Sequence, residues 1–260
     1  MYQTNRYSML IESLTELAEE QQTSPATLSE GLPSLSSVLA DAAPLPGEAL
    51  FLGIAEDGLP VLLNLQDPVP GPILITSDED GGKTKLLQMV ARAVEMLHIP
   101  AAVQYGVITQ HTEEWKNFKN QHNAGVWLTK SESTQELLQS LVNWAHDNRG
   151  EGQFFLLLID DLEALTYLDD QSRQNLRWLL LRGSSRRVWT LVTQNATRAR
   201  NLGAWLDFFR TRLFGFISKE DDAEVVAGKS DKAFSSLAKG IEFTMPEGKG
   251  WLNFWLPNIA

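Results

Sequence analysis

One turn of the chain combines glycine, lysine and threonine in the order that phosphate-binding loops use. Residues 73–84 read Ile-Leu-Ile-Thr-Ser-Asp-Glu-Asp-Gly-Gly-Lys-Thr, an apolar run that leads into this turn. In loops spaced G-x-x-x-x-G-K-[ST], backbone N–H groups surround phosphate oxygens, Lys reaches the β- and γ-phosphates, and the Ser/Thr hydroxyl binds Mg²⁺. The pattern predicts a nucleotide phosphate site at Ser77, Asp80, Gly81, Gly82, Lys83 and Thr84, with Ser77 at the first Gly position.

The same turn is acidic. Asp78, Glu79 and Asp80 place three carboxylates beside a site meant for a polyanion. Carboxylates that face the phosphates would repel ATP by up to about a few kcal/mol where water is excluded, and carboxylates that face solvent would cost almost nothing. The sequence leaves both orientations open.

Two further strand ends carry polar residues that suit phosphoryl transfer. Asp160 and Asp161 follow the apolar run 154–159, and Gln194 ends the run 188–193. Such chemistry needs Lys and Mg²⁺ on the phosphates, a carboxylate near the metal, and a group that orients water. Lys83, Thr84, Asp160 and Asp161 supply these groups, and Gln194 is placed to sense the γ-phosphate. A purely structural strand, turn and helix is the alternative.

The elements that must position these residues alternate between strands and helices. Apolar periodicity, caps and turn signals predict strands near 49–54, 59–65, 73–77, 101–108, 124–129, 154–160, 188–194, 213–217, 242–245 and 251–255, and helices near 86–97, 131–148, 171–182 and 218–228. Ser218 and Asp221 have the spacing of a capping box for the last helix. The alternation predicts an α/β fold with a mainly parallel sheet, helices on both faces, and hairpins at 49–65 and 242–255.

The N-terminal 47 residues are predicted to be a helical arm and linker, followed by a P-loop domain at 48–260. Apolar residues recur with helical spacing at Tyr7, Leu10, Ile11, Leu14, Leu17 and Ala18, which predicts a helix over 5–20. Residues 21–47 are rich in Ser, Pro and Ala, with a short helix expected near 28–39. The stripe either packs on its own domain or binds a partner.

Composition limits the class of protein. The chain has 260 residues, 43% of them hydrophobic, with 4 His and no Cys, which excludes disulfides and thiol chemistry. The His spacing does not suggest a metal site, and no apolar run reaches membrane-spanning length, so we expect a soluble, cytoplasmic protein without membrane contact.

Charge is unevenly distributed along the chain. The net charge is −11, which argues against a general polyanion binder. Residues 171–212 nevertheless carry nine Arg and one Asp. Arg198, Arg200, Arg210 or Arg212 could bind DNA phosphates or a neighbour's γ-phosphate. The alternative is a solvated helix face and loop with partners inside the same chain.

From about residue 51 to 255 the chain resembles the FtsK/HerA branch of P-loop motor ATPases, closest to FtsK-type DNA translocases. The resemblance includes the hairpin at 52–61, the Gly82-Lys83-Thr84 loop, the segment 126–149, the strand at 154–162 as Walker B, a helix at 180–187, a Thr193-Gln194 turn, and 208–218. It implies a RecA/FtsK-like fold, ATP and Mg²⁺ as cofactors, Asp160 at the metal, Asp161 and Gln194 in catalytic positions, and rings that pull duplex DNA.

The chain departs from that family at several functional positions. The family loop reads G-T-T-G-S-G-K-S, whereas Ser77 and Asp80 stand at two of its Gly positions, and Gly alone tolerates positive φ cheaply. Asp161 replaces a catalytic Glu, and Thr109, Gln110 and His111 stand in place of D-P-K. We therefore expect an ATP-binding protein with weak or lost hydrolysis. The alternative is a catalytically degenerate homologue that serves as a binding or assembly module.

Overall fold

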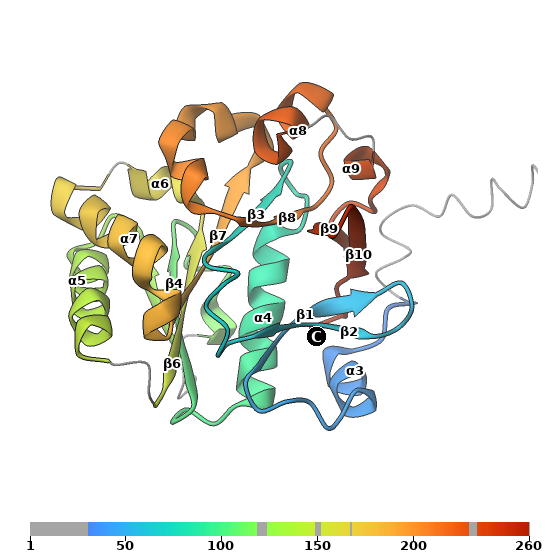
Figure 1. Cartoon of the computed structure of the whole chain (residues 1–260), viewed down its shortest axis with the longest axis horizontal. Helices are drawn as coiled ribbons and strands as arrows, with labels where there is room; N and C mark the ends of the chain where they lie inside the picture. The colour runs from blue at the N-terminus through green and yellow to red at the C-terminus, as the bar shows by residue number, and fades with distance from the viewer. Residues whose placement is uncertain (1–30, 119–123, 149–151, 167, 229–232, 260) are drawn as a thin grey trace, which may run out of the picture.

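A computed structural model describes residues 31–118, 124–148, 152–166, 168–228 and 233–259. The strands form one ten-stranded sheet in the order β2-β1-β10-β9-β8-β3-β7-β6-β4-β5 (Figure 1). Their bounds are β1 Ala49–Ala55, β2 Pro60–Asn64, β3 Ile73–Ser77, β4 Val103–Thr109, β5 Ala124–Leu128, β6 Phe154–Asp160, β7 Val188–Asn195, β8 Thr211–Phe214, β9 Glu242–Glu247 and β10 Gly250–Trp255.

Helices connect most of these strands. The α-helices are α3 Leu35–Asp41, α4 Lys83–Leu97, α5 Glu132–Asp147, α6 Leu162–Thr166, α7 Asp170–Arg182, α8 Glu220–Ala227 and α9 Ala233–Ser236, and the 3₁₀ segments are η1 Lys116–Phe118, η2 Ser184–Arg186 and η3 Ala196–Phe208. Within the described ranges, no helix is long and apolar enough to cross a lipid bilayer.

The six strands from β8 to β5 run parallel to their neighbours. The pairs β8-β3, β3-β7, β7-β6, β6-β4 and β4-β5 are all parallel, whereas the hairpins β1-β2 and β9-β10 extend the sheet with antiparallel strands. The predicted α/β fold with a mainly parallel sheet and two hairpins is therefore confirmed. Because β3, β7 and β6 are adjacent and parallel, their carboxyl ends meet at one edge of the sheet.

Side chains alternate between the two faces of the sheet and build two apolar cores. Ile73 and Ile75 pack with α4 and α3 on one face, whereas Leu74 packs with α5, α6, α7, η3 and α8 on the other. This is the period of two that a strand buried on both faces requires. In Figure 1, α4 runs along the centre of the molecule, and α5 and α7 lie together at one side. Helices thus cover both faces, as expected.

The described end of the N-terminal arm packs on the domain. The predicted helix at 5–20 lies outside the described residues, and the short helix expected near 28–39 is α3, which begins after the capping residue Ser34. The Leu35 amide donates to the Asn258 carbonyl at 2.7 Å, and the Asn258 amide donates to the Pro33 carbonyl at 3.0 Å. The chain before α3 therefore lies beside the last residues of the chain. The division at residue 47 stays a prediction.

The capping box predicted at Ser218 and Asp221 is wrong. α8 starts after Lys219, without a side-chain cap, and the Ser218 hydroxyl instead donates to Asp78 Oδ2 at 2.6 Å. The Ser218 amide donates to the same oxygen at 2.9 Å. In a cap the Ser hydroxyl would accept from a helix amide. Here it donates to a carboxylate instead, and such a charge-assisted hydrogen bond is the stronger of the two. The predicted end of this helix, at Gly228 with φ of 72°, is confirmed.

Candidate nucleotide site at the phosphate loop

The turn between β3 and α4 has the geometry of a loop that wraps an anion. β3 ends at Ser77, and α4 begins at Lys83 after Gly82, whose φ of 86° favours glycine. The N-terminus of α4 has no side-chain cap, so its amides point into the turn without a protein carboxylate as partner. A strand, a glycine turn and a helix N-terminus therefore stand where the sequence predicted a phosphate loop.

The loop has adapted to Ser77 in place of glycine. Ser77 is fully buried, and its hydroxyl donates to the Asp78 carbonyl at 3.1 Å. A Cβ at Gly81 would lie 2.3 Å from Ser77 Oγ, and a Cβ at Gly215 would lie 3.0 Å from Ser77 Cβ. Gly81 and Gly215, which have no side chains, thus leave room for the side chain of Ser77. Asp80, with φ of 56°, adopts the left-handed backbone that glycine would otherwise supply.

Lys83 holds the carbonyl groups at the end of β3. Its ammonium group donates to the Asp78 carbonyl at 2.6 Å and to the Ser77 carbonyl at 3.2 Å. Burial lowers the pKa of Lys83 to about 8, and the nearby carboxylates of Asp160 and Asp78 act in the opposite direction. The ammonium group lies inside the turn, within reach of any anion that the α4 amides bind.

Thr84 and Asp160 form the pair that suits a divalent cation. The Thr84 hydroxyl lies 3.1 Å from Asp160 Oδ1 and 3.2 Å from Asp160 Oδ2, and the Thr193 hydroxyl donates to Asp160 Oδ1 at 3.0 Å. Asp160 is 9% exposed. A hydroxyl and a carboxylate are hard oxygen donors of the kind that Mg²⁺ prefers, with water and phosphate oxygens completing the shell. The residues present therefore fit Mg²⁺.

Asp161 is held by its neighbours. Its Oδ1 accepts from the Glu163 amide at 3.0 Å, and its own amide donates to Thr193 Oγ1 at 2.8 Å. Arg198 Nη1 lies 3.8 Å from Asp161 Oδ2 and 3.0 Å from Glu163 Oε2. Burial raises the pKa of Asp161, while Arg198 lowers it. The Asp161 carboxylate thus accepts from an amide in the first turn of α6, lies near the Arg198 guanidinium and lines the cavity described below.

Gln194 does not line the site. Thr193 and Asn195 do, because successive side chains of β7 point to opposite faces and Gln194 falls on the other one. Gln194 is fully buried, and its amide donates to the Asn195 carbonyl at 3.1 Å. The structure therefore brings Asn195, rather than Gln194, to the loop. A catalytic role for Gln194 stays a prediction from the resemblance alone.

A cavity of about 190 Å³ joins these groups. Of the residues predicted as sites, it contains Lys83, Thr84, Asp160 and Asp161. Arg198, which the sequence offered only as a contact for DNA or for a neighbour's nucleotide, also lines it. The other lining residues were not predicted as sites, namely Glu79, Gln110, His111, Glu114, Thr193 and Asn195. Gln110 and His111 stand at the position of the family's D-P-K, which was the available signal. Burial raises the pKa of Glu114, with a smaller contribution from Asp160.

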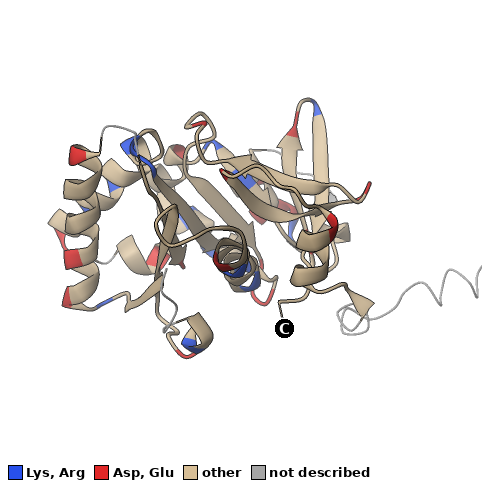
Figure 2. Cartoon of the chain, turned by 90° about the horizontal axis from the view of Figure 1, so that it is seen from below, with Lys and Arg blue, Asp and Glu red and all other residues tan. Residues whose placement is uncertain are grey.

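The three carboxylates of the loop are arranged differently from one another. Asp78 turns away from the cavity and binds Ser218, whereas Glu79 lines the cavity. Asp80 is exposed to solvent. Figure 2 shows Lys, Arg, Asp and Glu spread over many elements of the ribbon rather than gathered on one helix. Of the three carboxylates, that of Glu79 alone lines the cavity in which a phosphate chain would lie, and Glu79 is exposed to solvent.

The Arg-rich stretch is used largely within the chain. Arg212 donates to the carbonyls of Leu206, Phe209 and Val226. The other guanidinium groups with partners in the same chain are those of Arg173, Arg177, Arg186, Arg187, Arg198 and Arg200. Seven of the nine Arg residues thus have partners within the chain, which are mostly backbone carbonyls; Arg173 and Arg198 form ion pairs.

Comparison with known proteins shows the fold. No family model and no curated protein sequence matches the chain. Among solved structures, ATPases 2 and 3 of EccC from Thermomonospora curvata, in complex with a signal sequence peptide, match with a TM-score of 0.69 and 16% identity over 88% of this chain and 43% of that one. The pCW3 conjugation coupling protein TcpA with ATPγS matches with a TM-score of 0.66 and 16% identity, over 87% of this chain and 69% of that one. VirB4 of Thermoanaerobacter pseudethanolicus matches with a TM-score of 0.55 and 11% identity, over 83% of this chain and 97% of that one.

These matches establish the fold of FtsK/HerA-type P-loop ATPases for this chain, as the resemblance implied. The chain spans less than half the length of the EccC structure that it matches. At these identities the likeness shows fold alone, and function must be argued from the site.

Proposed function

We propose that this domain binds ATP with Mg²⁺ as a P-loop ATPase of the FtsK/HerA type and hydrolyses it slowly. The observation that carries the proposal is the meeting of Lys83, Thr84 and Asp160 in one cavity. Lys83 and Thr84 begin α4 after β3, and Asp160 ends β6, which β7 separates from β3 in the sheet. Lys83 and the amides of α4 hold the phosphate chain, and Thr84 and Asp160 hold the metal. Mg²⁺, when bound, neutralises charge that develops on the β- and γ-phosphates.

Slow turnover follows from the surroundings of Asp161. This carboxylate accepts the Glu163 amide and lies near Arg198, so it is already engaged before any water arrives. A general base must come within hydrogen-bond reach of the attacking water. Asp is one methylene shorter than the Glu that the family carries, which moves the carboxylate away from the phosphate.

Lengthening that side chain tests the proposal. Asp161→Glu should raise steady-state phosphate release from Mg-ATP by at least roughly tenfold, because the longer side chain reaches the water. Asp161→Asn, which keeps the size and removes the base, should lower release below that of the wild type. Equal rates for all three proteins would show that Asp161 takes no part in hydrolysis.

The second candidate is a homologue without catalysis that acts as a binding or assembly module. The bonds from Lys83 to the carbonyls of Ser77 and Asp78 favour it, because the loop satisfies its own lysine and Ser77 fills its interior. The two candidates differ in one respect. The first requires saturable binding of Mg-ATP, and the second is compatible with none.

Assembly into a ring and contact with DNA are further parts of the proposal, supported by the fold. DNA contact has less support from the surface, because seven of the nine Arg residues in 171–212 bind groups of their own chain. The solved neighbours come from secretion and from conjugation. The cargo of this domain is therefore a separate question from its nucleotide.

A further inference from the structure

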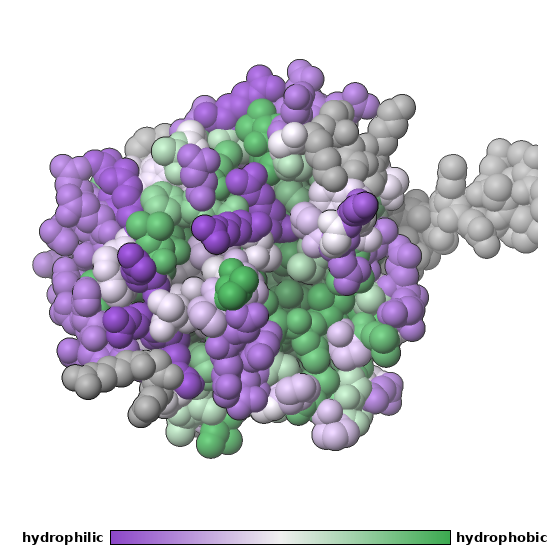
Figure 3. All heavy atoms as spheres, in the orientation of Figure 1, coloured by the Kyte–Doolittle hydropathy of each residue, from purple (hydrophilic) through white to green (hydrophobic). Residues whose placement is uncertain are grey.

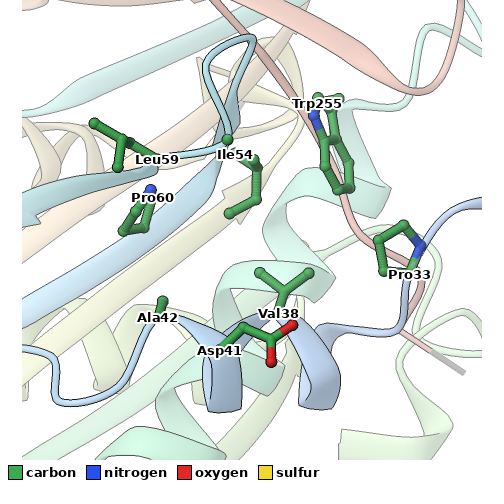
Figure 4. Close-up of a pocket in the computed structure, with 9 residues that line it drawn as sticks. Pro33, Val38, Asp41, Ala42, Ile54, Leu59, Pro60 and Trp255 are labelled. Atoms are coloured by element: carbon green, nitrogen blue, oxygen red, sulfur yellow. The ribbon is translucent and has the colours of Figure 1, made fainter.

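A second cavity lies at the edge of the sheet that β2, β1 and β10 form, and it shares no lining residue with the cavity at the phosphate loop. It measures about 450 Å³ and is formed by α3, the β1-β2 hairpin and β10. In Figure 4 the side chains of Val38, Ile54 and Trp255 point toward a common space, and Pro33 closes one side. Among the described residues that line it, Asp41 is the one that carries a charge. The cavity is thus an apolar socket with one acidic group on α3.

The socket is open to solvent. Leu59, which lines it at the tip of the hairpin, is 63% exposed. Figure 3 shows a hollowed hydrophobic area over the hairpin and α3. Exposed apolar surface of this kind commonly marks a binding site. Its lining lacks the convergent polar groups that orient a small polar ligand, so an apolar helix face is the better match.

The chain itself carries such a face. Tyr7, Leu10, Ile11, Leu14, Leu17 and Ala18 recur at helical spacing, and Glu12, Glu16, Glu19 and Glu20 fall on the opposite side. The stripe therefore fits a socket that is apolar, and its acidic side must face water, away from Asp41. No other stretch in residues 1–30 has this pattern.

The lining of the socket includes a residue close to the N-terminal arm, which also favours this arm as the segment that binds there. Pro33 lines the socket, so the chain that leads back to residue 18 starts at its rim. The 15 residues from Ala18 to Pro33 reach at most about 50 Å when extended, which is ample for the helix to turn back. A short tether gives an effective concentration on the order of millimolar, above that of any free partner.

We propose that residues 7–18 of this chain fold as an amphipathic helix and dock into the socket of the same molecule. The stripe buries Leu10, Leu14 and Leu17 as anchors between α3 and the β1-β2 hairpin. The N-terminal arm thereby belongs to the domain and covers its open apolar surface. The inference does not depend on nucleotide binding.

Hydrogen exchange of the full chain tests the proposal, with Leu59→Asp as the probe. Because Leu59 is exposed, this change leaves the core intact and places a carboxylate in the socket. We expect the amides of residues 7–18 to be protected in the wild type, and Leu59→Asp to reduce that protection by at least roughly tenfold. Val69→Asp is the matched control, because Val69 is 75% exposed and does not line the socket.

Three outcomes would overturn the proposal. The first is exchange of residues 7–18 of the wild type at the rate of an unstructured peptide, and the second is an equal effect of Leu59→Asp and Val69→Asp. Protection that rises with protein concentration over a roughly hundredfold range would assign the socket to the arm of a second copy. Protection that is independent of concentration and sensitive to Leu59 alone, with a reciprocal loss of protection at 54–60 in Leu14→Asp, supports docking within one chain.

Discussion

At the scale of single residues, Lys83 decides whether the loop is a binding site. Its ammonium group is buried and bound to two carbonyls, and burial lowers its pKa to about 8. A phosphate chain would compete with those carbonyls and would stabilise the charged form. The affinity for nucleotide is therefore coupled to the protonation of this one group.

Affinity for Mg-ATP should fall as the pH rises through 8. Below pH 8 the free protein already carries the charged Lys83, and above it the protein must first take up a proton, because the bound anion raises the pKa. Between pH 7 and pH 9 we expect a loss of roughly tenfold in the association constant, measured by calorimetry. Lys83→Arg, which stays charged, should give a flat profile. A flat profile for the wild type would mean that Lys83 does not meet the phosphates.

The roles of single residues were only partly predictable from sequence. The motif identified Lys83 and Thr84, and the structure places both in the cavity with Asp160 and Asp161. It did not indicate that Asp78 turns to Ser218, because that contact joins residues 140 positions apart. The sequence also did not show that Gln194 points away from the cavity. Which face of the sheet a strand residue lies on depends on the register of the strand, which the sequence alone does not determine.

At the scale of elements, the phosphate loop is braced by the segment before β9. A Cβ built on Gly82 would lie 2.8 Å from the Gly240 Cα, so the two glycines touch backbone to backbone. Both have similar dihedral angles, with φ of 86° and 81°. Gly82 and Gly240 are far apart in the sequence, and their contact holds the phosphate loop against the segment before β9.

The two glycines give a matched test of that contact. Gly240→Ala should cost about 1–2 kcal/mol, the price of a left-handed residue with a side chain, because its Cβ would meet nothing closer than 3.8 Å. Gly82→Ala has the same backbone cost and should add about 1–3 kcal/mol for crowding against Gly240. Urea denaturation measures both. Equal losses of stability would contradict the close approach.

The order of elements was predictable, and their ends were less so. The apolar runs predicted the existence of each strand in the parallel part of the sheet, although β8 lies at 211–214 rather than 213–217. The helix predicted over 131–148 is α5, which begins after Ser131. Capping at Ser218 was misjudged because the competing acceptor, Asp78, lies in another loop. Local patterns thus predict elements well, and contacts between loops require the fold.

At the scale of the whole molecule, the net charge and the exposed basic groups determine how well the protein can bind DNA. The chain carries a net charge of −11, and most of the basic stretch is engaged internally. Nonspecific affinity for DNA grows with the number of phosphates that free cations neutralise. The Arg-rich stretch as it is folded here therefore offers few such contacts.

The Arg-rich stretch should contribute little to the salt dependence of duplex DNA binding. Two of its nine Arg residues, Arg182 and Arg210, remain after the seven with internal contacts, so the stretch should add no more than about −2 to the log–log slope. Fluorescence anisotropy of a labelled duplex over a range of NaCl concentrations gives the slope for the wild type and for Arg186→Ala, and the two should be equal. A slope that is shallower by about one unit in Arg186→Ala would show that this internal contact opens to bind a DNA phosphate.

The central claim is that the altered loop still binds nucleotide, and titration calorimetry of Mg-ATP tests it most directly. The wild-type chain at pH 7 should show saturable binding, and Lys83→Ala should weaken it at least roughly tenfold, because the charge-assisted bonds to phosphate are lost. Lys85→Ala, two residues along α4 and outside the cavity lining, should bind as the wild type does. The absence of saturable binding in the wild type, or equal binding by Lys83→Ala, would contradict the account.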